Sequence, residues 1–126
     1  MNIEDALRPI TLCPGVEGVV IASAEGLLLA AHGQLQGDEA AACAAQLTIE
    51  TQTTMAILGH ERPMEAMLWT DTHVWYQTRT PSNHSVLAVS ASHAHAGALR
   101  MAVRSALPAI QDAMDQLHTD PATHGD

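Results

Sequence analysis

This chain has 126 residues, with five arginines, no lysine and 14 acidic residues, and its formal net charge is −9. A charge of that sign repels phosphate groups, which argues against nucleic acids and anionic membrane surfaces as partners. Apolar residues make up 47% of the chain, enough for one folded domain and too many for a disordered segment. The aromatic residues are Trp69, Trp75 and Tyr76, too few to line a deep ligand pocket.

Two cysteines and the N-terminal sequence indicate the compartment. Cys13 and Cys43 show no paired spacing, and the first residues, MNIEDALRP, lack the basic and apolar segments of a secretion signal. We therefore predict a reduced, cytoplasmic protein, with Cys43 as a small buried residue of an alanine-rich helix. The longest apolar stretch, residues 18–31, is interrupted by Glu25 and predicts two strands, so we expect no membrane insertion.

The chain begins with a short predicted helix and a β-hairpin. Asn2 can cap a helix with one apolar face, and Pro9, which lacks a backbone amide, should end or kink it early. Residues 16–23 and 27–32 are rich in Val, Ile and Leu, and the connection between them contains Gly26, which can adopt a left-handed conformation. This pattern predicts two antiparallel strands joined by a tight turn.

Residues 38–58 predict a long helix, with Asp38 as its N-cap and Gly59 as its terminating residue. The helix carries apolar side chains on two sides. One stripe comprises Ala40, Ala44, Leu47, Met55 and Leu58. The other comprises Ala42, Ala45, Ile49 and Ala56. Because a surface helix needs only one apolar stripe, we predict that a partner subunit covers the second one. Ile49→Arg should then prevent association.

Residues 65–70 and 73–79 flank a two-residue connection and predict a second hairpin, in which residue 70 pairs with residue 73. Trp69 should lie opposite residue 74, and Trp75 opposite residue 68. Both faces of this hairpin are partly apolar, so one should meet the core and the other a further surface. Met67 and Trp69 fit internal packing and an interface on an edge strand equally well.

Residues 85–91 predict a fifth strand, and a final helix follows. Its apolar stripe comprises Leu99, Val103, Ala106, Leu107, Ile110, Met114 and Leu117. Arg100 and Arg104 fall on the opposite side of this helix, where we expect solvated side chains. Pro108 should kink the helix.

The elements follow the order α-β-β-α-β-β-β-α, which indicates an α+β domain with a five-stranded sheet, mixed or antiparallel. Residues 1–118 are interpreted as this single domain, and the polar residues 119–126 as a flexible C-terminal tail.

Several segments together resemble the Roadblock/LC7 family. They are the hairpin PGVEGVVIASAEGLLLA, the helix start DEAAACAAQL, and the strands MLWTDTHVWYQTR and HSVLAVSA. The resemblance runs over about residues 12–117, and its most specific part is Ser-Ala-Glu-Gly-Leu, close to the Ser-x-Asp/Glu-Gly-Leu turn of the family. It implies a profilin-like sandwich with the strand order 2-1-5-4-3.

The resemblance also implies a function. Family members form homodimers by pairing their long second helices and the edge strands that follow, here residues 38–58 and 65–70. Bacterial members accompany Ras-like small GTPases as activators or docking platforms, and some belong to sensor-kinase complexes. We therefore expect a non-enzymatic homodimeric regulator or scaffold for a Ras-like small GTPase. The expected dimer interface comprises Ala42, Ala45, Ile49, Ala56, Met67 and Trp69.

No catalytic, cofactor or metal site is assigned from the sequence. Without lysine the chain cannot form the phosphate-binding loop of nucleotide hydrolases. His93 and His95 supply only two of the three or four ligands that a zinc site needs, so we expect exposed imidazoles. One alternative function stays open, a small-ligand sensor domain of PAS-like or profilin-like topology.

Overall fold

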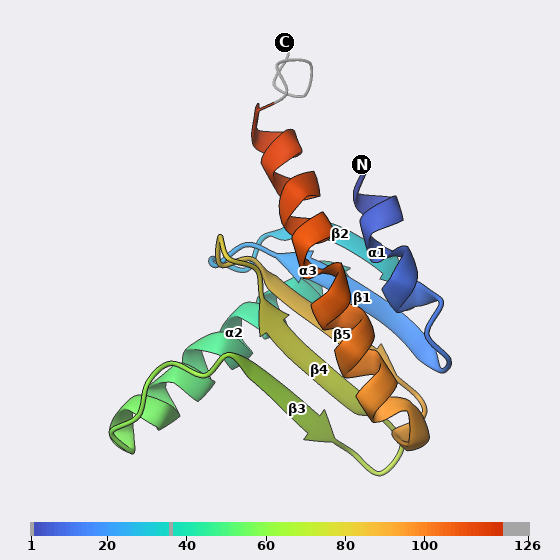
Figure 1. Ribbon diagram of the computed structural model, residues 1–126. Helices are drawn as coiled ribbons and strands as arrows, with labels where there is room; N and C mark the ends of the chain where they lie inside the picture. The colour runs from blue at the N-terminus through green and yellow to red at the C-terminus, as the bar shows by residue number, and fades with distance from the viewer. Residues whose placement is uncertain (1, 36, 120–126) are drawn as a thin grey trace.

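A five-stranded sheet separates helices α1 (Ile3–Thr11) and α3 (Ala96–Thr119) on one face from helix α2 (Gly37–Ile57) on the other (Figure 1). The computed structural model describes residues 2–35 and 37–119. The strands are β1 (Val16–Ala22), β2 (Leu28–Gly33), β3 (Glu65–Trp69), β4 (Val74–Arg79) and β5 (Ser85–Ser90). One turn of 3-10 helix, η1 (His93–His95), leads into α3.

All neighbouring strands are antiparallel, and their order in the sheet is β2-β1-β5-β4-β3. This order and the element sequence confirm the predicted α+β fold. The second hairpin has the predicted register, with Leu68 opposite Trp75 and Trp69 opposite Val74. Strands β2 and β3 form the two edges of the sheet, so β3 has a hydrogen-bonded neighbour on one side only. Within the described residues no helix is long and apolar enough to cross a membrane.

The main core lies between the sheet and the pair α1 and α3. Alternation along β1 sends Val19 and Ile21 into this core and Val20 towards α2, as expected for a strand covered on both faces. Tyr76 of β4 is completely buried there. The apolar stripe of α3 supplies much of the remainder, and its most buried members are Leu99, Val103 and Ile110.

A smaller core lies under the first half of α2. Val20 and Leu87 of the sheet pack there against Ala41 and Ala44 of the helix. Because alanine side chains are small, the helix lies close to the sheet. The hairpin turn between β1 and β2 also touches α2 through Gly26, which has the predicted left-handed conformation with φ of +91°. A Cβ atom at this position would lie 3.3 Å from that of Ala45.

The sequence predicted that Pro9 ends or kinks the first helix early. The helix does not end there, because α1 continues to Thr11. Two features outweigh the missing amide of Pro9. The side chain of Asn2 caps the helix by accepting from the Asp5 amide at 2.8 Å, as predicted. The apolar face of α1, which includes Leu7, is buried against α3 and the sheet.

The ends of the two long helices differ slightly from the predictions. Helix α2 begins at Gly37, so Asp38 lies in its first turn and is not its N-cap. Gly59 terminates it as predicted, with φ of +78° and a bond from the His60 amide to the Met55 carbonyl at 2.8 Å. Helix α3 continues through Pro108 to Thr119, so residue 119 is helical, and residues 120–126 of the expected tail lie outside the described residues.

Candidate dimerisation surface

The free edge of β3 presents an unpaired row of backbone groups. The Thr70 amide donates to the His73 carbonyl at 2.8 Å, so the backbone groups of residues 66, 68 and 70 point towards β4. Those of Glu65, Met67 and Trp69 therefore point away from the sheet. Sheet proteins normally protect such an edge, because it can pair with a strand of another chain.

The side chains on this edge are largely apolar. Met67 is half-buried and packs against the main core. Trp69 points to the same face but is 56% exposed, and its ring makes an edge contact with His93 at a centroid distance of 5.2 Å. Leu68 points to the α2 face and is 46% exposed. The edge thus combines unpaired hydrogen-bonding groups with exposed apolar surface.

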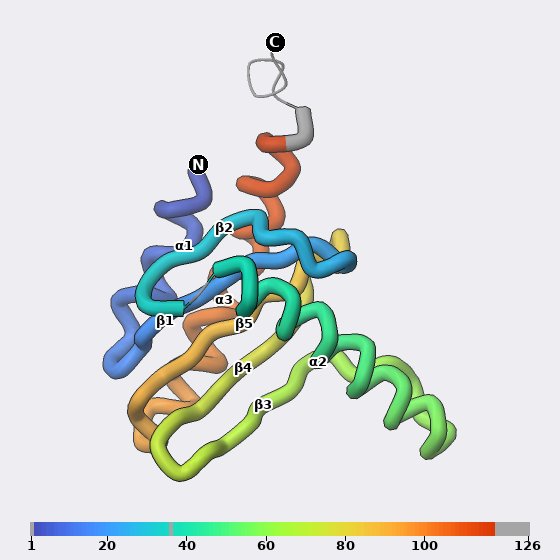
Figure 2. The backbone as a smooth tube through the Cα atoms, turned by 180° about the vertical axis from the view of Figure 1, so that it is seen from behind, coloured from blue at the N-terminus to red at the C-terminus, as the bar shows by residue number. Residues whose placement is uncertain are grey.

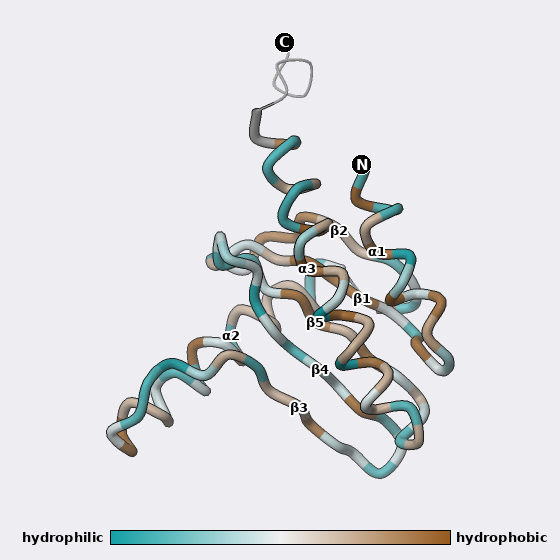
Figure 3. Tube along the Cα trace, in the orientation of Figure 1, coloured by the Kyte–Doolittle hydropathy of each residue, from teal (hydrophilic) through white to brown (hydrophobic). Residues whose placement is uncertain are grey.

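Helix α2 is only half supported by its own subunit. All of its buried residues lie between positions 40 and 45. Thr48 still contacts Gln77 and Ser85 of the sheet. Farther along, the helix projects past the end of the sheet (Figure 2), and we call residues 50–58 the α2 arm. Ile57 and Leu58 of this arm are 81% and 62% exposed. The far end of α2, coloured as hydrophobic in Figure 3, thus exposes apolar side chains that its own subunit does not cover.

The two flanks of α2 face different parts of the molecule. Towards the β1–β2 turn lies Ala42, whose Cα would be 3.5 Å from a Cβ atom at Gly26. Ile49 and Ala56 follow at intervals of seven residues and share this flank, which we call the turn-facing flank. The opposite flank faces β3 and β4 and is called the β3-facing flank. On this flank, Cys43 borders a cleft that Trp75 also lines. Leu47, Glu50 and Thr54 border a second cleft, together with Pro63 and Glu65.

The structure therefore separates the six residues predicted for the interface. Met67 and Trp69 lie at the free edge of β3. The exposed residues Ala42, Ile49 and Ala56 lie on the flank of α2 that faces away from that edge. Ala45 is 7% exposed and packs within its own subunit. Cys43, predicted to be buried, is exposed instead.

The sequence prediction placed Leu47 in an apolar stripe but did not identify the β3-facing flank as the side of α2 that lies next to the free edge. Helical periodicity groups residues on a face. It does not say how the helix crosses the sheet, and that crossing decides which flank lies next to the free edge.

An ion pair fixes the start of β3 to helix α3. The Arg100 guanidinium donates through Nε and Nη2 to the two carboxylate oxygens of Glu65, each at 2.9 Å. The Tyr76 hydroxyl donates to the same carboxylate, and Arg104 Nη1 lies 4.0 Å from it. Arg100 and Arg104 lie at the surface as predicted, with side chains 41% and 35% exposed, but both face Glu65 within the subunit.

These contacts shift two pKa values in opposite directions. Hydrogen bonds from Arg100 and then from Tyr76 stabilise the charged carboxylate and lower the pKa of Glu65 from 4.5 to about 2. Burial, followed by the hydrogen bond to Glu65, raises the pKa of Tyr76. The carboxylate is thus ionised and the phenol neutral at neutral pH.

Arg62 and Arg79 form a second group of cations, at the end of β4. Both guanidinium groups donate to Oδ1 of Asn83, and Arg79 also donates to the Pro63 carbonyl. Burial, together with the neighbouring charge of Arg62, lowers the pKa of Arg79. Among the described residues neither arginine has a carboxylate within ion-pair distance. These contacts hold the connections around β3 and β4 together.

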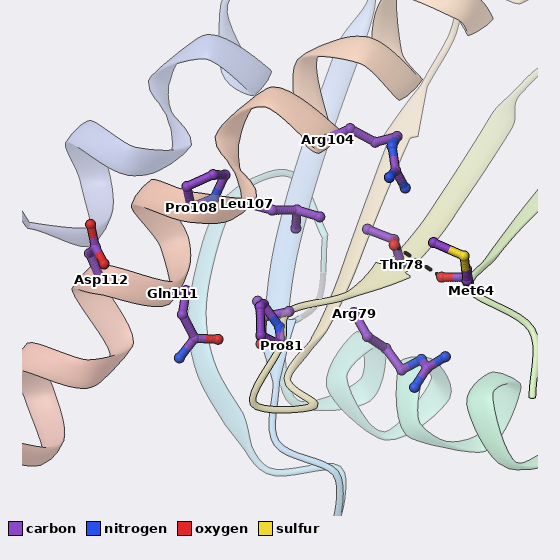
Figure 4. A pocket seen from close by; sticks show the side chains of 10 residues that line it. Met64, Thr78, Arg79, Pro81, Arg104, Leu107, Pro108, Gln111 and Asp112 are labelled. Atoms are coloured by element: carbon purple, nitrogen blue, oxygen red, sulfur yellow. Dashed lines mark hydrogen bonds between the residues drawn. The ribbon is translucent and has the colours of Figure 1, made fainter.

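A surface groove of about 660 Å³ lies between α3 and the end of β4 (Figure 4). Its apolar lining includes Leu107 and Pro108, and Arg104 points into it above Thr78. The charged groups at this groove are Arg104, Arg79 and Asp112. Over residues 2–35 and 37–119, no three side chains of His, Cys, Asp or Glu come together as metal ligands would.

The sheet order and the placement of the helices define an α+β domain of profilin-like topology, in which the outer side of edge strand β3 is unpaired. The chain belongs to the Roadblock/LC7 family, because the model of the Roadblock/LC7 domain matches residues 2–91. No curated protein matches this chain significantly.

Known structures show the same fold at low sequence identity. A Roadblock/LC7 domain from Streptomyces avermitilis superposes with a TM-score of 0.78 at 15% identity, over 90% of this chain and 98% of that chain. For MglB from Myxococcus xanthus the TM-score is 0.74 at 13% identity, over 90% of this chain and 91% of the other. For the gliding protein MglB from Thermus thermophilus it is 0.74 at 19% identity, over 90% and 86% of the chains.

Proposed function

We propose that this chain is a non-enzymatic, homodimeric module that docks or modulates a Ras-like small GTPase in a bacterial signalling complex in the cytoplasm. The observation that carries the proposal is the unpaired edge of β3, flanked by the exposed half of α2. Membership of the Roadblock/LC7 family and the structural likeness to MglB support the same function. A sensor-kinase complex is a further expected associate.

In the proposed dimer, β3 pairs with β3 of a second copy. Strand β3 has three residues with outward backbone groups, and a twofold axis at Met67 places Glu65 opposite Trp69 of the partner. All three residues then form hydrogen-bonded pairs. A shift by two residues in one direction would place Trp69 opposite Pro63, which has no amide to donate. The Met67-centred register therefore makes full use of the edge.

The proposed role is regulation, because the chain lacks the groups for nucleotide hydrolysis. It has no lysine, and Arg100 and Arg104 face Glu65 within the subunit. We propose that the turn-facing flank, which the β3 contact leaves uncovered, is the part that meets the GTPase. Its small residues would allow close approach, and Ile49 is 52% exposed.

The test compares two substitutions on opposite flanks of α2. Sedimentation should give a dimer for the wild type and for Ile49→Arg, and a monomer for Leu47→Arg, whose site faces β3. Native extract labelled with a photoreactive GTP analogue should yield a labelled protein of Ras size with the wild type and less with Ile49→Arg. A monomeric wild type, or capture with no labelled protein, contradicts the proposal.

The alternative function, a small-ligand sensor, rests on one observation, the groove of about 660 Å³ beside α3. Its volume falls within the usual range for ligand sites, about 300–1,000 Å³. A thermal-shift screen of metabolites tests it. One compound that raises the melting temperature by several degrees, with the effect abolished by Leu107→Arg, would favour the sensor.

A further inference from the structure

The groove beside α3 has one wall made by a single side of that helix (Figure 4). The helical residues that line it recur at intervals of three and four, and they are Arg104, Leu107, Pro108, Gln111 and Asp112. The opposite wall includes Pro81, which follows β4, and Met64, which precedes β3. The groove therefore runs along α3 for about two helical turns.

The middle of the groove is apolar and open to solvent. Leu107 is half-buried, with one side packed against the main core. Pro108 and Pro81 are exposed, and Met64 is 67% exposed. An apolar ligand body lying here would shield these side chains from water, which is the main source of affinity in most small-molecule sites.

Arg104 is the cation that points into the groove (Figure 4). Among residues 2–35 and 37–119, the one carboxylate oxygen in its reach is Oε1 of Glu65, at 4.0 Å, which is beyond hydrogen-bond distance. The Glu65 carboxylate already accepts hydrogen bonds from Arg100 and Tyr76. Since a guanidinium group carries five N–H donors, Arg104 has donors left for an anion in the groove.

Positive charge is concentrated at this corner of an acidic chain. The formal net charge is −9, yet four of the five arginines lie around the start of β3, and they are Arg62, Arg79, Arg100 and Arg104. Arg79 also lines the groove, and within the described part of the chain it has no carboxylate partner. These charges favour an anionic ligand.

Asp112 limits that ligand to one negative charge. It lies at the end of the groove opposite Arg104 (Figure 4). The charged groups at the groove are Arg79, Arg104 and Asp112, which leave a net charge of +1. A ligand with a second negative charge at its far end would be repelled by the Asp112 carboxylate, whereas an uncharged end would not.

We propose that this groove binds a small aliphatic monocarboxylate, with the carboxylate on Arg104 and the chain over Leu107 and Pro108. A guanidinium group can donate two parallel hydrogen bonds to a carboxylate. From Arg104 to Gln111 the helix rises about 10 Å, close to the length of extended octanoate. The inference rests on the alternative function, the small-ligand sensor, and gives it a ligand class. Because the site lies within one subunit, it does not depend on the homodimer.

Calorimetric titration with octanoate at pH 7 tests the proposal. Two further compounds separate the parts of the ligand, since octanol has the chain without the charge and acetate has the charge without the chain. Octanoate should bind and raise the melting temperature. Octanol and acetate should each bind about tenfold more weakly or worse, because each lacks one of the two contacts.

Two substitutions in the groove should change the affinity for octanoate in opposite directions. Arg104→Gln should raise the dissociation constant about tenfold or more, because it removes a charge-assisted hydrogen bond. Asp112→Asn, at an exposed position, should lower it, and more so at low salt, because the groove becomes more positive. Arg8→Gln is the matched control and should bind like the wild type, since Arg8 lies on α1 and pairs with Asp5.

The outcomes separate this inference from the sensor function itself. Octanoate that fails to bind, octanol that binds as tightly, or affinity unchanged by Arg104→Gln and Asp112→Asn would each overturn the carboxylate ligand. A different metabolite whose stabilising effect is abolished by Leu107→Arg would keep the sensor and overturn only the ligand class. A screen in which neither octanoate nor any metabolite stabilises the protein would contradict both.

Discussion

Glu65 on the edge strand and Arg100 on helix α3 form a two-pronged ion pair, 35 residues apart in sequence, with both nitrogen–oxygen distances at 2.9 Å. The pair joins β3, the strand that we propose for dimerisation, to α3, which covers the sheet face opposite α2. Tyr76, completely buried in β4, donates to the same carboxylate. The position of the free edge is thus fixed from within the subunit.

Glu65 should make stability depend on pH in the acid range. Its pKa is lowered to about 2 in the folded protein, so the folded state favours the ionised form more than the unfolded chain does. The resulting stability is present above pH 4.5 and is lost as the pH falls towards 2. Glu65→Gln should lower the free energy of unfolding at pH 7 by about 1 kcal/mol.

Urea unfolding at pH 7 and at pH 3 measures this effect. The difference between wild type and Glu65→Gln should shrink at the lower pH, where the carboxylate is protonated in the unfolded chain while it is still largely ionised in the folded protein. Arg8→Gln is the control, because the pair of Arg8 and Asp5 is exposed and lies on α1. An equal difference at both pH values would contradict the assignment.

Pro9 should destabilise α1 although the helix tolerates it. Its side chain is exposed, so Pro9→Ala removes no packing and restores one amide to the helix interior. We expect the free energy of unfolding to rise by about 1–3 kcal/mol in urea titrations. Pro108→Ala, at an exposed position inside α3, should act in the same direction. A loss of stability in both variants would show that the proline rings make contacts that outweigh the missing amides.

The sequence predicted the fold better than the contacts between distant segments, for a physical reason. Strands, turns and caps depend on neighbours in the chain, and the positions of Gly26 and Gly59 and the pairing of residues 68 and 75 followed from local patterns. Contacts between segments that are distant in the sequence did not follow from such patterns. The ion pair of Glu65 with Arg100 gives no local signal, because either residue alone fits a solvated surface.

The same limit applies to the flanks of α2. Counting along the helix identified residues that share a side, including Ile49, but the angle at which α2 crosses the sheet is set by packing of the whole domain. That angle turns Cys43 and Leu47 towards β3 and Ile49 away from it. Ala45 was assigned to the second stripe but lies near its margin, next to the buried Ala41 and Ala44.

Gly26→Ala should destabilise the protein because of both backbone and packing. The residue has φ of +91°, and the new Cβ atom would lie 3.3 Å from the Cβ atom of Ala45. We expect a loss of about 1–2 kcal/mol in the free energy of unfolding. Gly97→Ala is the matched control, since it lies in α3 with no atom near the added methyl group. It should stabilise the helix by about 0.5–1 kcal/mol, and an equal loss in both variants would contradict the argument.

Trp69 tests the register proposed for the β3 pair. In that register it lies opposite Glu65 of the partner subunit, beside the ion pair, so its exposed ring is buried only on association. Trp69→Ala should therefore weaken the dimer by about tenfold to a hundredfold, as loss of a buried aromatic anchor does. Sedimentation over a dilution series measures the dissociation constant. Met101→Ala is the control, because Met101 is likewise exposed, at 60%, and belongs to α3, which lies outside the proposed strand pair. If Trp69→Ala dimerises as tightly as this control, the strands do not pair around Met67, and Trp69 serves only to pack against His93.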